Sequence, residues 1–219
     1  MTVELDFLAV LKDWPMLLVG VVWTLGLTFV ATSLGLVIAV ACAWTRSRGP
    51  AWAAAPVAAY VEVVRNTPFI VQLFFIFFGL PSLGIRLSPA FASVLAMTLN
   101  LGAYGTEIVR AGLLATPRGQ IEAAQSLALS TFQVFTRVVL PPALKKVWPA
   151  MVSQIVIVML GSAVCGQIAT EELSYAANVI SAASFRTFEA YIIATVIYLC
   201  LAIGLRRFLN WFGPRFVFG

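Results

Sequence analysis

The amino-acid sequence predicts an all-α integral membrane protein with five transmembrane helices. Of the 219 residues, 61% are hydrophobic and 11% are charged, and the mean hydropathy is +0.98. A soluble domain is about 45–50% apolar and about 25% charged, so 14 Lys and Arg with 9 Asp and Glu are too few to cover a water-exposed surface. Long charge-free runs also separate these charges, and a membrane helix needs about 20 mostly apolar residues.

The five predicted spans follow the charge-free runs in chain order. The second span must begin ahead of FIVQLFFIFFGL and cross Glu62 and Arg65. The segment between Arg110 and Lys146 carries several charges and three prolines, so it is expected outside the membrane as two short helices joined by a polar break at Ser130. The spans are predicted at residues 17–43, 56–80, 89–108, 147–168 and 188–205.

The distribution of Lys and Arg predicts the orientation. Only Lys12, Arg86 and Arg186 fall on the side of the N-terminus, and the other eleven of the fourteen cations fall on the opposite side. By the positive-inside rule the N-terminus is outside and the C-terminus is cytoplasmic. The net charge of +5 is therefore interpreted as a topology signal, and nucleic-acid binding is set aside.

The chain is divided accordingly into an outer interfacial segment at residues 1–16, a transmembrane domain at 17–208 and a cytoplasmic tail at 209–219. The transmembrane domain includes a cytoplasmic segment at 113–146. The N-terminus has no basic region and no small-residue cleavage site, so it is not read as a removable signal peptide. A short helix in the outer interface is expected there from the helical spacing of Val3, Phe7, Val10, Leu11 and Trp14.

The composition argues against catalysis by this chain. It has no His, and Cys42, Cys165 and Cys200 are far apart, so no metal site and no disulfide framework are predicted. The nearest string to a phosphate-binding loop runs from Gly161 through Gly166, but Gln167 stands where that loop needs a Lys. Energy for any pumping must therefore come from a partner.

An ordered set of motifs resembles the membrane permease subunits of bacterial ABC importers, in the branch for polar amino acids such as histidine, glutamate, glutamine and arginine, and for opines. Each motif alone is weak, whereas their order and spacing over residues 17–208 are specific. The motifs are Glu122-Ala123-Ala124 followed by Val138-Val139-Leu140-Pro141, Arg65-Asn66-Thr67-Pro68 with Gln72-Leu73-Phe74-Phe75, and Leu99-Asn100-Leu101-Gly102-Ala103-Tyr104 with Glu107 and Arg110.

The resemblance implies a subunit that forms the path for a polar amino acid or a derivative by alternating access, in the bacterial cytoplasmic (inner) membrane. This chain would bind no cofactor, because two ATP-binding subunits would hold ATP and Mg. An external solute-binding protein and a second permease subunit complete the implied complex.

Residues 113–146 then resemble the loop that couples the permease to the ATPase. Glu122 would reach into the ATPase cleft; without the resemblance it would be read as a solvated carboxylate at a helix start. The residues assigned to coupling are Glu122, Ala123, Ala124, Leu127, Ala128, Leu140 and Pro141.

The sequence departs from the pattern of this family in two ways. Ala128 stands where a glycine is usual, and a helix tolerates alanine better. Leu160 and Gly161 stand where many relatives carry a Lys-Asp pair, so the acid that could contact a substrate ammonium group is missing. The second departure resembles permease chains that work with an unlike partner, and a non-identical second subunit is expected.

Polar residues inside the spans are candidates for the substrate path, because such residues usually face a bundle interior or a watery cavity. Thr67 precedes a proline and is biased away from helical geometry. The alternative for each residue is an interhelical hydrogen bond, which is preferred for Thr98 and Gln154. Local ion pairs are expected for Glu62 with Arg65 and for Glu107 with Arg110. The candidates are Thr67, Gln72, Asn100, Ser162 and Gln167.

Two other classes of function are kept open at this point. The first is an ion-gradient-driven carrier or a channel that needs no ATPase, and the second is a membrane scaffold. The absence of an internal inverted repeat and of an intramembrane Asp counts against the carrier. The coupling-type segment counts against both.

Overall fold

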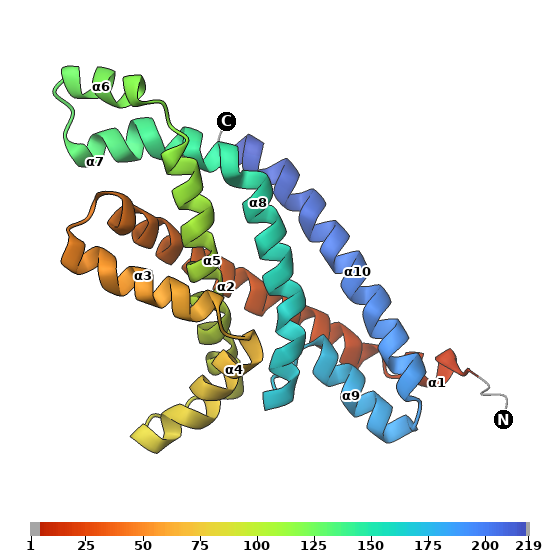
Figure 1. Cartoon of the computed structure of the whole chain (residues 1–219). Coiled ribbons are helices and arrows are strands. Elements are labelled where there is room, and N and C mark those ends of the chain that lie inside the picture. The colour runs from red at the N-terminus through yellow and green to blue at the C-terminus, as the bar shows by residue number, and fades with distance from the viewer. Residues whose placement is uncertain (1–4, 218–219) are drawn as a thin grey trace.

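Residues 5–217, which the computed structural model describes, contain helical elements only, as the sequence predicts (Figure 1). Elements labelled η are 3₁₀ or π segments that extend or end an α-helix. In chain order the elements are α1 (Phe7–Leu11), α2 (Trp14–Arg48), α3 (Ala51–Arg65), α4 (Phe69–Phe74), η1 (Phe75–Gly79), η2 (Leu80–Leu83), α5 (Pro89–Leu114), α6 (Arg118–Ser126), α7 (Thr131–Gln133), η3 (Val134–Val139), α8 (Leu140–Gly161), η4 (Ser162–Ile168), α9 (Leu173–Ser184), α10 (Thr187–Phe212) and η5 (Gly213–Val217).

Three helical stretches in the described residues are long and apolar enough to cross a bilayer. They are Trp14–Arg48, Thr131–Ile168 and Thr187–Phe216, and they contain the predicted first, fourth and fifth spans. The first is longer than predicted: its 35 residues extend over about 52 Å at 1.5 Å per residue, against a hydrocarbon core of about 30 Å.

The predicted second span is not one straight helix. α3 and Phe69–Leu83 meet at an angle of 112°, and together they are a fourth candidate for a membrane span. The break follows from Pro68, which has no N–H to donate and keeps the preceding residue out of helical geometry. The sequence places the interruption correctly at Thr67, inside the predicted span at residues 56–80, and that the bent pair crosses the membrane as one span stays a prediction.

α5 occupies the predicted third span and is the most enclosed of the long helices. Leu101, Gly102 and Ala103 are buried in succession, followed by Gly105 and Thr106. On a helix with 3.6 residues per turn, consecutive burial means that protein covers the whole circumference. Because α2, α3 and α8 pack on it, α5 needs less apolar surface than a lipid-facing span, and it is not among the three apolar stretches.

The two short helices expected in residues 113–146 are α6 and α7, which lie together beyond the ends of α5 and α8 (Figure 1). Ser130 is the N-cap of α7, where its side chain and that of Gln133 form a reciprocal capping box. α7 then continues through η3 into α8, so the second short helix is continuous with the helical stretch that contains the predicted fourth span.

Helix α9 was not predicted from the sequence. Its 12 residues are too few for a span, but Leu173, Ala177 and Ile180 are buried in a core that includes Leu17 of α2 and Ala190 of α10. Hydrophobicity alone does not separate such a short buried helix from the apolar runs on either side of it.

The N-terminal segment differs from the single interfacial helix that was predicted. Val3 lies outside the described residues. α1 contains only five residues, and Val10 is fully buried in the core with α9 and α10, while Trp14 begins α2. The backbone N–H of Asp6 donates to the carboxylate of Glu189 at 3.0 Å. This segment is therefore packed onto α10.

We expect Gly112→Ala to destabilise the chain although alanine favours helices. An added Cβ would lie 2.8 Å from the carbonyl oxygen of Ala143 and 2.8 Å from Cγ1 of Val147, where α5 crosses α8. Overpacking of this kind costs about 1–3 kcal/mol. The matched control is Gly204→Ala in α10, which meets nothing within 4 Å and should stabilise by up to about 1 kcal/mol. Thermal unfolding midpoints in detergent should move in opposite directions.

Candidate functional site

Three of the five predicted path residues form one hydrogen-bond network at the break between α3 and α4. Nε2 of Gln72 donates to the carbonyl of Val64 at 2.7 Å and to the carbonyl and hydroxyl oxygens of Thr67, each at 3.0 Å. Nδ2 of Asn100 on α5 donates to Oε1 of Gln72 at 3.1 Å. The sequence indicated each of these residues, and the fold brings them together.

The network supplies hydrogen-bond donors to backbone carbonyl groups that the helix break leaves without partners. The proline at 68 ends α3 early and leaves carbonyl groups of its last turn without helical donors. The amide of Gln72 donates to one of these carbonyls, that of Val64, and to the carbonyl of Thr67 in the break, while Asn100 ties that amide to α5. Backbone and side-chain polar groups are therefore concentrated at one bend next to the central helix.

Ser162 and Gln167 do not join this network. Ser162 is fully buried, and its hydroxyl donates to the carbonyl of Met159 at 2.6 Å. The side chain of Gln167 is exposed and makes no hydrogen bond within the described residues. Neither side chain is placed with Thr67, Gln72 and Asn100.

A second buried polar cluster surrounds Glu172, a residue to which the sequence assigned no role. Glu172 is fully buried; Oε1 accepts from the backbone N–H of Tyr175 at 2.8 Å and Oε2 accepts from the hydroxyl of Tyr198. The next backbone N–H, of Leu173, donates to Thr24 Oγ1 at 3.2 Å. The carboxylate thus caps α9 and connects it to α10, and burial raises its pKa despite these hydrogen bonds.

A charged cluster centres on Glu107 of α5, whose carboxylate is shared by three arginines. Arg110 contacts it at 2.8 Å and Arg65 at 4.0 Å, and Arg46 of α2 donates to the other oxygen. The predicted pair of Glu107 with Arg110 is present. The predicted pair of Glu62 with Arg65 is wrong within the described residues: Arg65 lies near Glu107 and over the ring of Tyr104, 5.5 Å from its centroid.

The coupling residues divide into exposed and inward-facing groups. Glu122 and Ala123 are exposed on α6, Leu127 is 75% exposed and Pro141 is exposed at the start of α8. Ala124 is only 5% exposed and packs in the chain's own core, against which Leu140 is also packed. Ala124 and Leu140 thus hold the two short helices to the transmembrane core.

Ala128 is not in a helix, contrary to the expectation that a helix would accommodate it. Its φ is +57°, in the left-handed region that glycine adopts freely and alanine only with strain. It follows α6 and precedes the N-cap of α7, so this residue reverses the chain between the two short helices. A glycine at this position would fit the turn without strain.

The two hydrogen-bond roles preferred for Thr98 and Gln154 are not seen in the described residues. The Thr98 hydroxyl is buried without a partner, and Gln154, half-buried on α8, makes no hydrogen bond there. The described residues also contain no group of three or more His, Cys, Asp or Glu side chains that could hold a metal ion.

Comparison with known proteins identifies one family over most of the chain. Residues 31–218 match the family described as binding-protein-dependent transport system inner membrane component. The nopaline transport system permease protein NocM of Agrobacterium fabrum is 31% identical over 96% of this chain and 93% of its own length. The glutamine transport system permease protein GlnP of Escherichia coli is 32% identical over 94% of this chain and 95% of its own.

Solved structures give the same result. A chain from the crystal structure of an amino acid ABC transporter with histidines superposes with a TM-score of 0.87 at 32% identity, covering 97% of this chain and 99% of that one. A chain of the inward-facing MetNI methionine ABC transporter superposes with a TM-score of 0.67 at 22% identity, covering 89% and 95%. The second likeness concerns the fold alone.

We expect Glu107→Gln to lower the stability of the chain by about 1–2 kcal/mol, because it leaves three neighbouring guanidinium groups without their shared carboxylate. Glu62→Gln removes the same charge from the neighbouring α3 at an exposed position and should change stability by less than about 0.5 kcal/mol. Thermal unfolding in detergent measures both, and equal effects would contradict the cluster.

Ala128→Gly should stabilise the turn between α6 and α7 by about 1 kcal/mol, because glycine adopts a positive φ without strain. Ala123→Gly is the matched control: in the interior of α6 the same substitution should destabilise the helix by about 1 kcal/mol. Hydrogen exchange of peptides covering residues 118–133 should slow in the first variant and accelerate in the second. Faster exchange in both would contradict the left-handed geometry.

Proposed function

The chain belongs to the family of binding-protein-dependent transport system inner membrane components, and from that premise we propose how it works as the permease subunit of an ABC importer for polar amino acids or opines. The named relatives NocM and GlnP are permeases of nopaline and glutamine transport systems. We propose a substrate of the same chemical class, an amino acid or amino acid derivative.

The proposed topology has five spans, with the N-terminus outside and the C-terminus in the cytoplasm of a bacterium whose inner membrane holds the protein. α2, the bent pair of α3 and α4, α5, the stretch from α8 to η4, and α10 supply these spans. The shared contacts of Arg46, Arg65 and Arg110 with Glu107 support the assignment of all three cations to one side.

Coupling is proposed to run through α6. The single observation that carries this role is the division of its surface: Glu122 and Ala123 are exposed while Ala124 is buried against the chain's own core. A helix that is anchored on one face and open on the other can transmit a movement of a docked partner to the transmembrane core. Two ATP-binding subunits, which hold ATP and Mg, are the proposed partners, and the hydrolysis would take place on them.

The proposed path lies at the bend between α3 and α4. Broken helices present backbone groups to substrates in many transporters, and here Thr67, Gln72 and Asn100 already gather at one. Alternating access would move this bend between the two sides as two permease chains rock against each other. An external solute-binding protein would deliver the substrate.

We propose that the second permease chain is not identical to this one. Gly161, where many relatives carry an acid, has open space around it, so a side chain at this position would face a neighbour or the path. The hydroxyl of Ser162 turns inward instead and bonds to Met159. A polar contact from the fourth span to the substrate would therefore come from the other chain. The ion-gradient carrier, kept open from the sequence, is disfavoured by the family membership.

We expect Glu122→Lys to abolish coupling while the chain still inserts normally. A carboxylate in a closing partner cleft makes charge-assisted contacts, and reversing its charge costs several kcal/mol where the contact is buried. The mutant complex should lose ATPase association or substrate-stimulated ATP hydrolysis in proteoliposomes. Glu171→Lys, an equally exposed reversal on the proposed outer side, is the control and should retain both. Normal hydrolysis and transport in Glu122→Lys would refute the coupling role.

A further inference from the structure

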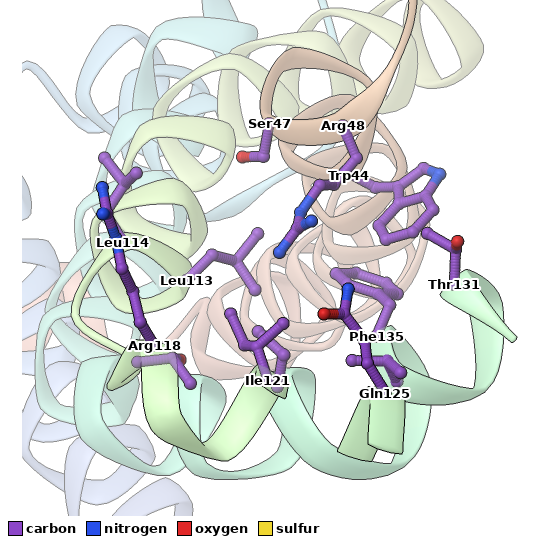
Figure 2. A pocket seen from close by; sticks show the side chains of 13 residues that line it. Trp44, Ser47, Arg48, Leu113, Leu114, Arg118, Ile121, Gln125, Thr131 and Phe135 are labelled. Atoms are coloured by element: carbon purple, nitrogen blue, oxygen red, sulfur yellow. The ribbon is translucent and has the colours of Figure 1, made fainter. Parts of the chain in front are cut away.

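A cavity of about 240 Å³ lies between the ends of α2 and α5 and the two short helices α6 and α7. Figure 2 shows Arg48 reaching from α2 into this space, with Ser47 beside it, Arg118 at the opposite rim and Gln125 below. The translocation and coupling roles proposed above do not use this cavity. It separates α6 from the transmembrane core over part of its length.

The cavity is lined by two arginines and by neutral polar side chains, with no acidic side chain to balance the positive charge. Arg48 and Arg118 make no ion pair or hydrogen bond to any described residue. The hydroxyl of Ser47 is buried and also has no partner. No Asp or Glu lines the cavity. A ligand that satisfies these groups must carry negative charge and several acceptor oxygens.

An apolar groove of about 590 Å³ adjoins the cavity on the other side of an aromatic pair. Trp44 and Phe135 line both spaces, and their ring centroids are 4.1 Å apart. The rest of the groove is almost wholly aliphatic and aromatic. Its further lining is Leu36, Val37, Val40, Ala41, Phe132, Thr136 and Leu140.

One face of α2 passes from the groove to the cavity. Val37, Ala41, Trp44 and Arg48 follow one another at spacings of four, three and four residues, which places them on one helix face. The stripe is about 16 Å long at 1.5 Å per residue, close to half of a hydrocarbon core of about 30 Å. Its order, aliphatic, then aromatic, then cationic, is that of one leaflet from its centre to its headgroups.

We propose that the groove and the cavity together bind one anionic phospholipid. An acyl chain lies along Val37 and Ala41, and the headgroup phosphate lies past the Trp44–Phe135 pair between Arg48 and Arg118, where Ser47 donates to it. Because α6 forms one wall of the cavity, the bound headgroup bridges the transmembrane core and the helix that carries Glu122. The site itself requires only that the chain span a bilayer, so it stands or falls independently of the coupling role.

Lipid retention by the complete transporter tests this site. Purified complex is titrated with phosphatidylglycerol or with phosphatidylcholine, and bound lipid is counted by native mass spectrometry. Arg48→Gln with Arg118→Gln should weaken phosphatidylglycerol binding about 25-fold, at about five-fold for each arginine removed, and leave phosphatidylcholine unchanged. Arg206→Gln with Arg207→Gln removes equal charge from exposed positions of α10 and should leave the tight site intact. Equal loss in both pairs would overturn the proposal.

A groove variant and a free anion distinguish a lipid from another phosphate source. Ala41→Trp, at an exposed position of the groove, should reduce phosphatidylglycerol retention while both arginines remain. Inorganic phosphate should not displace the lipid at concentrations that leave the complex intact. If phosphate displaces it and Ala41→Trp has no effect, the site takes a free anion and the lipid assignment is wrong. If the arginine pair variant loses the ATPase in neutral lipid, the cavity receives an acidic group of that partner, which also overturns the assignment.

Discussion

Every interruption of a helix leaves backbone N–H and C=O groups that a bilayer cannot satisfy, and this constraint shapes the whole chain. The amide of Gln72 closes the break at Pro68, and Glu172 caps α9. Ser130 and Gln133 cap α7 in the same way outside the proposed membrane region. These polar side chains stand where the backbone needs them. Of these side chains, Gln72 also belongs to the proposed substrate path, so at that bend one amide serves both the backbone and the proposed site.

The enclosed helix α5 connects the other helices of the chain to one another. Asn100 ties it to the bend between α3 and α4, and Glu107 ties it to α2. Gly112 lets it approach α8 closely enough that no Cβ fits between them. A displacement of α8 would therefore move α5, and the hydrogen bond of Asn100 to Gln72 would pass that movement to the proposed path. This arrangement offers a physical connection from α6 and α7, which lead into α8, to the bend.

Arginines near the ends of α2, α3 and α5 and at the start of α6 serve two different purposes. The arginines around Glu107 are paired and hold α2, α3 and α5 together. Arg48, the last residue of α2, and Arg118, the first residue of α6, have no such partner in the described residues. The paired arginines fix the helices relative to one another, and the unpaired arginines form the polar end of the proposed lipid site.

The sequence alone determined the class of protein, its all-helical fold, the break at Thr67 and the break between two short helices at Ser130. These features depend on composition or on residues within about four positions of each other, so local rules suffice. The family resemblance also rests on local motifs, and the comparisons bear it out.

Only the tertiary structure decided which helix faces meet, and the residue roles that depend on those faces could not be read from the chain. In the structure, Arg65 lies near Glu107 and not beside Glu62. Ala124 is buried, and Ala128 has a left-handed backbone conformation. α9 and the burial of Glu172 were not predicted, because the sequence of a 12-residue apolar run does not indicate which helices will pack against it. Burial and pairing result from contacts between segments far apart in sequence, and spacing along the chain carries no record of those contacts.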